Sequence, residues 1–316
     1  QTEPSDLQTL LNETSQSLLL AIRNGDVVAA CMLVVEGELQ GDIAEEVYRS
    51  RRRLKGHLLP QSLACHYGYP ELLANRFCRV VRIAVHPQLQ RQGLGLKILD
   101  KVSEYSDADF VGTSFAYEES VLQFWQNAGY QLLRVGSKRD TCSGSHSVLM
   151  IKQLNNEHAT IQSMREQLAV AYPVALKEVY SECALAETSA ILACLARQRK
   201  HSLSQATLNA VLRYIGAELA YESAYAALYE FSCAYTSMAF ATDVSINHES
   251  GGLDTELLAY VVIAKLLQGK QWAEVARLCG LSGRKMVEQH LRQALAEILD
   301  IAESKRLINR NQQQNR

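Results

Sequence analysis

The sequence lacks the patterns that mark metal centres, disulfide scaffolds and P-loops. Its eight cysteines are scattered without a C-x-x-C pair, and most lie in apolar runs, as small buried hydrophobic residues do. We therefore expect reduced thiols and no metal site. The sequence also contains no G-x-x-x-x-G-K-[ST] segment, so ATP binding of the P-loop type is not expected within these 316 residues.

Long apolar runs and strong net charge are missing as well. No apolar stretch reaches membrane-spanning length and no signal-peptide layout opens the chain, so we expect a cytoplasmic protein without a membrane partner. The formal net charge of -2 gives no overall attraction to nucleic acid, and RNA contacts would have to come from local basic clusters. Such clusters lie at residues 49–55, at Arg139 and at residues 305–316. The first of them is explained nearly as well by a solvated helix end.

The run from Arg82 to Leu96 is the most informative stretch of the sequence. A strand rich in β-branched residues passes through His86-Pro87 into a helix start with glycines at 93 and 95. Glycines let an anion approach the backbone, and the first N–H groups of a helix point toward such a loop. The spacing predicts a pyrophosphate site. It is not a Rossmann fingerprint, because Ile98 stands where the third glycine would be.

The first half of the chain alternates strand and helix signals. Asn24-Gly25 between two apolar runs predicts a hairpin over residues 18–35. The remaining elements are expected as a helix over 43–54, a strand over 77–85, a helix over 94–105, a strand over 110–115, a helix over 118–127, and strands over 130–135 and 147–151. This order predicts an α+β domain over residues 1–154, with a mixed sheet and flanking helices.

The second half, residues 155–316, reads as an all-helical tail domain, for which the family resemblance given below implies an RNA-binding role. Within it, residues 261–299 resemble a helix-turn-helix, with Ser282 as the N-cap of the last helix, although a plain helix pair is favoured. Tyrosines 214, 221, 225 and 229 recur at helical spacing and are expected to pack rather than stack on bases. The basic, polar residues 305–316 are expected to be disordered.

The first domain resembles the GNAT acetyltransferases, whose coenzyme A loop has the spacing found after Val85. A more specific resemblance is to the tRNA(Met) cytidine acetyltransferases of the TmcA type. It rests on residues 58–66, 79–87, 114–117 with 124–130, and Arg139 with 143–146, and residues 281–285 fit the tail domain of that family. The family has an ATPase module upstream of its acetyltransferase domain. The chain begins with Gln1 rather than Met, and we expect it to be the C-terminal portion of such a polypeptide.

The resemblance implies a donor substrate, an acceptor and a set of binding residues. The donor is acetyl-CoA, and the acceptor is cytidine at the wobble position of elongator tRNA(Met), which becomes N4-acetylcytidine. ATP would be used by the upstream module, which would be an intramolecular partner. The implied cofactor-binding residues are Ile83, Ala84 and Val85 for the acetyl group and pantetheine, the loop Gln90, Arg91, Gln92, Gly93, Leu94, Gly95 and Leu96 for the pyrophosphate, and Ser120 and Asn127 near coenzyme A.

Acetylation of cytosine requires a base of moderate strength, because the exocyclic amine loses its proton as the C–N bond forms. His86, at the strand end next to the acetyl site, is the first candidate, and the alternative is a histidine that only caps the strand. Arg139 is a candidate to hold an RNA phosphate or the cytosine carbonyl, against the alternative of a solvated charge. Weaker candidates are His146, Tyr117, Glu118 and Glu119.

Two other functions fit parts of the sequence. One is a GNAT acetyltransferase for a small amine or a protein amine, which an acidic acceptor groove would favour. The other is an acetyl-CoA-sensing regulator that binds DNA through residues 272–296. No DNA partner is expected on the preferred interpretation, and burial of this helix pair against the rest of the tail would contradict the regulator.

Overall fold

The computed structural model describes residues 16–141, 143–154, 159–195, 203–239, 255–305 and 307–308. The chain forms two compact units, Gln1–Met164 and Arg165–Arg316. The division lies ten residues beyond the predicted boundary at 154, within helix α6 (Ala159–Ala175). Among the described residues, no helix has both the length and the apolar character needed to cross a membrane.

The N-terminal unit begins with the predicted hairpin. Strands β1 (Gln16–Arg23) and β2 (Asp26–Gly37) are antiparallel and joined through Asn24 and Gly25. Both turn residues have positive φ, 55° at Asn24 and 89° at Gly25, as a type I′ turn requires. The turn chemistry therefore fixes the register of the two strands.

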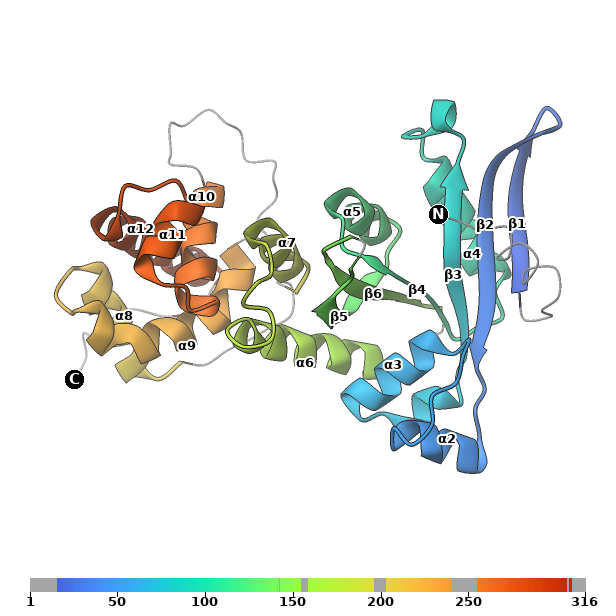
Figure 1. Ribbon diagram of the computed structural model, residues 1–316, viewed down its shortest axis with the longest axis horizontal. Helices are drawn as coiled ribbons and strands as arrows, with labels where there is room; N and C mark the ends of the chain where they lie inside the picture. Colours follow the sequence, from blue (N-terminus) through green and yellow to red (C-terminus); the bar gives the residue numbers. More distant parts are fainter. Residues whose placement is uncertain are drawn as a thin grey trace. The chain divides into compact units, whose positions relative to one another are not determined.

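Six strands form one mixed sheet in the order β1-β2-β3-β4-β6-β5 (Figure 1). The remaining strands are β3 (Arg76–Val85), β4 (Phe110–Ala116), β5 (Gln131–Arg139) and β6 (His146–Gln153). All neighbouring pairs are antiparallel except β3 and β4, which are parallel. The carboxyl ends of β3 and β4 therefore lie at the same end of the sheet.

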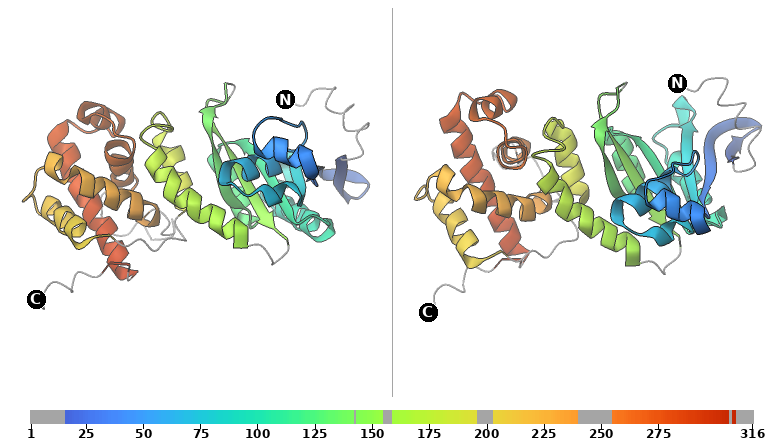
Figure 2. Two further views of the ribbon diagram at one scale, coloured as in Figure 1. Left: turned by 90° about the horizontal axis from the view of Figure 1, so that it is seen from below. Right: turned by 60° about the horizontal axis from the view of Figure 1, so that its bottom comes forward.

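Helices cover both faces of the sheet. On one face, α2 (Gly41–Tyr48), α3 (Leu58–Tyr67) and the short η1 (Pro70–Leu73) share an apolar core with the strands and with the start of α6. Figure 2 shows α2 and α3 together over the strands. On the other face lie α4 (Leu94–Tyr105), after the short η2 (Pro87–Leu89), and α5 (Glu119–Asn127). The predicted mixed sheet with flanking helices is confirmed.

The helix predicted over 43–54 is wrong at its C-terminal end. The observed α2 ends at Tyr48, and Ser50 has a left-handed φ of 59°, which stops the helix. The arginine cluster therefore lies in a loop, and α3 is a further helix that the periodicity did not predict.

The C-terminal unit is helical in its described residues. Besides α6 it comprises α7 (Leu185–Leu195), α8 (Gln205–Ile215), α9 (Tyr221–Ala239), α10 (Thr255–Val262), the π-helical η3 (Ile263–Leu267), α11 (Trp272–Leu278) and α12 (Arg284–Ser304). Tyr214 is fully buried, and Tyr221 and Tyr225 pack against the same core, as expected. The predicted disordered end falls largely outside the described residues, since only 305, 307 and 308 belong to them.

The helix-turn-helix-like segment is part of the core of this unit. Helix α12 packs against α8, α9 and α10, and Arg284 at its start pairs with Glu222 and Glu288 and lies over the Trp272 ring. The predicted N-cap is wrong, because α12 begins after Gly283, with φ of 151°, rather than after Ser282. Burial of the helix pair against the tail counts against the DNA-binding regulator.

Candidate active site

Strands β3 and β4 form a fork. Their parallel pairing covers Phe77 with Phe110, Cys78 with Val111, and Arg79 with Gly112, and the described register stops there. Beyond this point the two strands diverge (Figure 1). At the branch point, the buried Thr113 hydroxyl donates to the carbonyl of Val80 at 3.1 Å. The hydroxyl of Thr113 thus takes the place of the next backbone hydrogen bond between β3 and β4, and the two strands separate after it.

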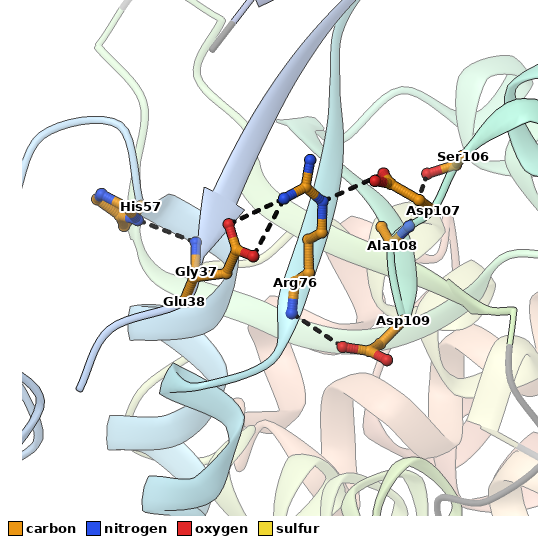
Figure 3. Close-up of polar contacts among 8 residues, drawn as sticks. All are labelled: Gly37, Glu38, His57, Arg76, Ser106, Asp107, Ala108 and Asp109. Atoms are coloured by element: carbon orange, nitrogen blue, oxygen red, sulfur yellow. Dashed lines mark hydrogen bonds and ion pairs between the residues drawn. The ribbon is translucent and has the colours of Figure 1, made fainter.

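A polar network holds the paired end of the fork together. Arg76 at the start of β3 donates to Glu38 at 3.0 and 3.1 Å and to Asp107 at 3.1 Å, and its backbone N–H donates to Asp109 at 2.9 Å (Figure 3). These partners come from the end of β2 and from the loop before β4. The network therefore ties β2, β3 and β4 together where they pair, and leaves the other end free to open.

The last residues of β3 form one prong of the fork. One edge of this prong pairs with β2, where Ile83, Ala84 and Val85 lie opposite Cys31, Ala30 and Ala29. The other edge faces the opening, and the pairing with β4 among the described residues does not reach it. Apart from the Val85 carbonyl, which accepts from the Gln90 side chain, backbone groups on that edge are available to a ligand. The register also shifts between Val80 and Arg82, so Val81 is a β-bulge that redirects the prong.

The side chains of this prong alternate between the two faces of the sheet. A Cβ placed at Gly95 would lie 3.7 Å from Val85 Cγ2, so Val85 points toward α4. Ala84 and Arg82 consequently point to the opposite face, on which α2 and α3 lie. An acyl group held along this edge could therefore be reached from the α3 face.

The predicted pyrophosphate loop leads from the prong into α4. Gln90 folds back so that its side-chain amide donates to the carbonyl of Val85 at 3.1 Å, and Gln92 donates to Gln88 at 3.1 Å. Arg91 and Gly93 both have left-handed backbones, with φ of 58° and 78°. At Gly93, with no neighbouring atom within 4 Å of a Cβ, the requirement is the backbone conformation rather than space.

Helix α4 begins directly after this loop. Gly93 is its N-cap, and within the described part of the chain no side chain accepts a hydrogen bond from its first turn. Several N–H groups and the positive end of the helix dipole are thus directed at the loop, which suits a phosphate. Gly95 has a different role from the one its spacing suggests, because a Cβ there would lie 3.0 and 3.2 Å from the Phe124 ring of α5.

Helix α5 lies beside the start of α4. Glu118 is its N-cap and accepts hydrogen bonds from the backbone of Ser120 and Val121, while the Ser120 hydroxyl donates to it at 2.7 Å. These bonds, the one from the Ser120 hydroxyl first, lower the pKa of Glu118. Ser120 is therefore engaged in capping, and Asn127 lies at the other end of α5, about 10 Å along the axis. Contact of either with coenzyme A stays a prediction.

His86 and Arg139 lie on opposite prongs. His86 follows β3, and its backbone N–H donates to the carbonyl of Val28 at 2.9 Å. Backbone atoms thus complete the strand end, and the exposed imidazole is not needed for that purpose. Arg139 ends β5 opposite His146, whose carbonyl accepts from Tyr117 at 2.8 Å. Three of the predicted residues, Arg139, His146 and Tyr117, therefore share the β4 prong.

Sequence reasoning did not find the residues that shape the fork. Thr113 lies in an otherwise apolar strand, where a buried hydroxyl needs a partner, and that was the available signal. The bulge at Val81 and the contact of Gly95 with Phe124 depend on strand pairing and helix packing, and periodicity reports neither.

The chain is similar to known proteins both in its N-terminal half and over most of its length. The model of the family "GNAT acetyltransferase 2" matches residues 2–110 and 103–155. The tRNA(Met) cytidine acetyltransferase TmcA of Vibrio cholerae is 32% identical over 301 residues, which cover 95% of this chain and 39% of that protein. TmcA of Nitrosococcus halophilus is 30% identical over 308 residues, again 95% of this chain and 39% of that protein.

Among solved structures, a polyamine N acetyltransferase of Drosophila melanogaster is 17% identical, with a TM-score of 0.35 over 49% of this chain and 83% of that one. The chain spans 39% of the length of the two curated relatives given above. Residues 2–155 match the model of the GNAT acetyltransferase 2 family, and over 95% of its length the chain is similar to the tRNA(Met) cytidine acetyltransferases TmcA.

Proposed function

We propose that the chain contains the acetyl-transfer site of a tRNA(Met) cytidine acetyltransferase, and that its acceptor is the wobble cytidine of elongator tRNA(Met). The observation that supports this most is the open fork of β3 and β4 next to the uncapped start of α4, in a chain similar to TmcA over nearly its full length. The donor substrate is acetyl-CoA, which is used by the GNAT acetyltransferases, whose family model residues 2–155 match. ATP use is assigned to the parts of the relatives outside this chain.

The residues present fit such a donor. The diphosphate would lie on the N–H groups of the first turn of α4, where Gly93 leaves the approach open. The pantetheine and acetyl group would follow the unpaired edge of Ile83, Ala84 and Val85, whose backbone can hydrogen-bond an extended amide chain. A backbone N–H on this edge would also stabilise the oxyanion that forms at the thioester carbonyl.

Transfer then requires an acceptor nitrogen in line with the carbonyl. The cytidine N4 atom attacks the carbonyl carbon, the C–N bond forms, and the C–S bond breaks to release coenzyme A as a thiolate. The proton lost by N4 passes to a base, for which the exposed His86 imidazole at the end of β3 is the candidate, and then to the thiolate. Arg139 on the other prong is assigned to a phosphate or to the cytosine carbonyl.

Nucleoside mass spectrometry tests this proposal. The chain is incubated with acetyl-CoA and an elongator tRNA(Met) transcript, with and without ATP, and coenzyme A binding is measured by calorimetry in parallel. We expect N4-acetylcytidine at the wobble position, at a low rate because the remaining parts of the relatives are not in this chain. Gly95→Glu, which buries a carboxylate against Phe124, should abolish binding and product. Absence of coenzyme A binding by the unaltered chain would contradict the proposal.

A further inference from the structure

The loop between α2 and α3 has more positive charge than its neighbours neutralise. We call it the basic loop, residues 49–57, and its cations are Arg49, Arg51, Arg52, Arg53 and Lys55. Two of them pair with carboxylates of α2, Arg49 with Glu45 at 2.5 Å and Arg52 with Glu46 at 3.6 Å. Among the described residues, no carboxylate pairs with the other three, all of which are exposed.

The basic loop is held in place by specific hydrogen bonds. The Gln61 side chain accepts from the backbone of Leu54 at 3.0 Å and donates to the carbonyls of Leu54 and His57 at 2.8 and 2.7 Å. At its other end, Arg51 and Arg52 donate their backbone N–H groups to the carbonyl of Glu46 at 2.9 and 3.2 Å. The cations are therefore mounted on an ordered backbone, which lowers the entropy cost of binding.

Further positive charge lies beside the loop. Burial raises the pKa of the Cys65 thiol, while the Ser50 hydroxyl and the charge of Arg134 in β5 lower it. Burial and then Arg134 lower the pKa of the neighbouring His66. The Nε atom of Arg134 is buried without a hydrogen-bond partner among the described atoms. Arg134 is thus a further cation that acts electrostatically on Cys65 and His66 of α3.

Hydrogen bonds and one ion pair connect the basic loop to β3. The end of the basic loop is anchored where His57 Nδ1 accepts from Gly37 at 2.9 Å, and Leu59 donates to Glu36 at 2.8 Å. Glu36 also pairs with Arg79 of β3. From Arg79, the strand reaches Ala84 in about 17 Å, at 3.3 Å per residue. Arg82 lies between them, exposed and on the face that α3 flanks, and its guanidinium donates to the carbonyl of Val81 at 3.1 Å.

We propose that the basic loop, continued by Arg82, binds the phosphate backbone of the RNA acceptor and guides the target base into the fork from the α3 face. This inference rests on the proposed function. Closely spaced, unpaired guanidinium groups on an ordered loop suit phosphates, which they contact with paired N–H groups. Phosphates repeat along an RNA strand, so several exposed cations can each contact a different phosphate.

Equilibrium binding of an elongator tRNA(Met) transcript at a series of salt concentrations tests the inference. The variant is Arg51→Gln/Arg53→Gln, and the matched control is Lys101→Gln/Lys152→Gln, which removes two cations on the α4 face. Each lost phosphate contact removes about one unit of the logarithmic salt slope. We expect the variant to lose about two units, so that its affinity ratio between 50 and 200 mM salt is about tenfold smaller than that of the unaltered chain.

The control should keep the slope, and Arg51→Lys/Arg53→Lys should retain most of it because the charge is conserved. All replaced side chains of the loop are exposed, and unchanged melting temperatures would show intact folding. An unchanged slope in Arg51→Gln/Arg53→Gln, with normal cytidine acetylation by the unaltered chain, would overturn this inference alone. Failure of the unaltered chain to bind tRNA at 50 mM salt would overturn both proposals. Loss of binding to phosphatidylserine vesicles, with the RNA slope retained, would assign the loop to a membrane surface instead.

Discussion

Replacement of Gly95 by alanine should destabilise the α4–α5 contact through a measurable clash. The added methyl group would lie 3.0 and 3.2 Å from two atoms of the Phe124 ring, inside the optimal separation of about 3.5–4.0 Å for carbon atoms. Overpacking of this kind costs about 1–3 kcal/mol. The gain in helix propensity from glycine to alanine returns at most about 1 kcal/mol. We therefore expect Gly95→Ala to lower the free energy of unfolding by about 0–3 kcal/mol.

A double-mutant cycle separates the clash from other effects. Phe124→Leu removes the ring that the methyl group meets, so the double variant should be more stable than the sum of the single effects by about 1 kcal/mol. Gly93→Ala is the matched control. It meets no atom within 4 Å and is unfavourable only because of its φ of 78°, so it should be additive with Phe124→Leu.

Native-state hydrogen exchange of α4 and α5 amides is the appropriate assay, since it reports on this unit separately from the helical unit. Coenzyme A affinity should follow the same pattern, with Gly95→Ala weakening binding and Phe124→Leu partly restoring it. Additivity of Gly95→Ala and Phe124→Leu within about 0.5 kcal/mol would refute the packing role of Gly95.

Three further predictions concern the fork and its flanks. Thr113→Val should leave the Val80 carbonyl buried without its partner, which costs about 1–3 kcal/mol of stability and weakens coenzyme A binding in calorimetry. Thr113→Ser should behave as the unaltered chain. Equal coenzyme A affinities of the valine and serine variants would contradict this prediction. His86→Ala should slow acetylation without changing the coenzyme A dissociation constant, and normal turnover would show that the imidazole has no role in the chemistry. The pKa of Glu118 is lowered in the folded state, so its capping contribution should be complete at pH 7 and should disappear as the pH falls through that lowered value. Glu118→Ala should therefore cost less than about 1 kcal/mol in urea unfolding at pH 7 and nothing near pH 2, and a constant difference would argue against the carboxylate as the cap.

Local chemistry made several elements of the N-terminal unit predictable. Asn24-Gly25 requires positive φ at two adjacent residues, and only a hairpin turn uses that combination between apolar runs. Pro87 ends the pairing of β3, and the glycine at 93 begins α4 as its spacing predicts. In each case the residue that decides the conformation lies within the element or next to it.

The incorrect predictions concern helix ends whose position depends on residues distant in the sequence. The cluster at 49–55 has good helix formers, but Ser50 turns the backbone and Gln61 of the next helix holds the loop. Ser282 is a good N-cap by type, yet the N-cap is the next residue, Gly283, and α12 starts at Arg284, which pairs with Glu222 and Glu288. Propensity is a weak term, and contacts of this kind override it.

The fork itself illustrates why a site can be located from sequence while its mechanism of formation cannot. The glycine spacing identified the loop, because phosphate binding uses the backbone N–H groups of a glycine-containing helix start, and such a start is visible in the sequence. The opening, however, depends on the Thr113 hydroxyl replacing a ladder hydrogen bond, on a bulge at Val81, and on Arg76 closing the opposite end. Each of these contacts forms only after β3 has paired with β2 or β4, whose residues are distant in the sequence. Substitutions at Thr113 should therefore affect the donor site although this residue lies outside every sequence motif that pointed to it.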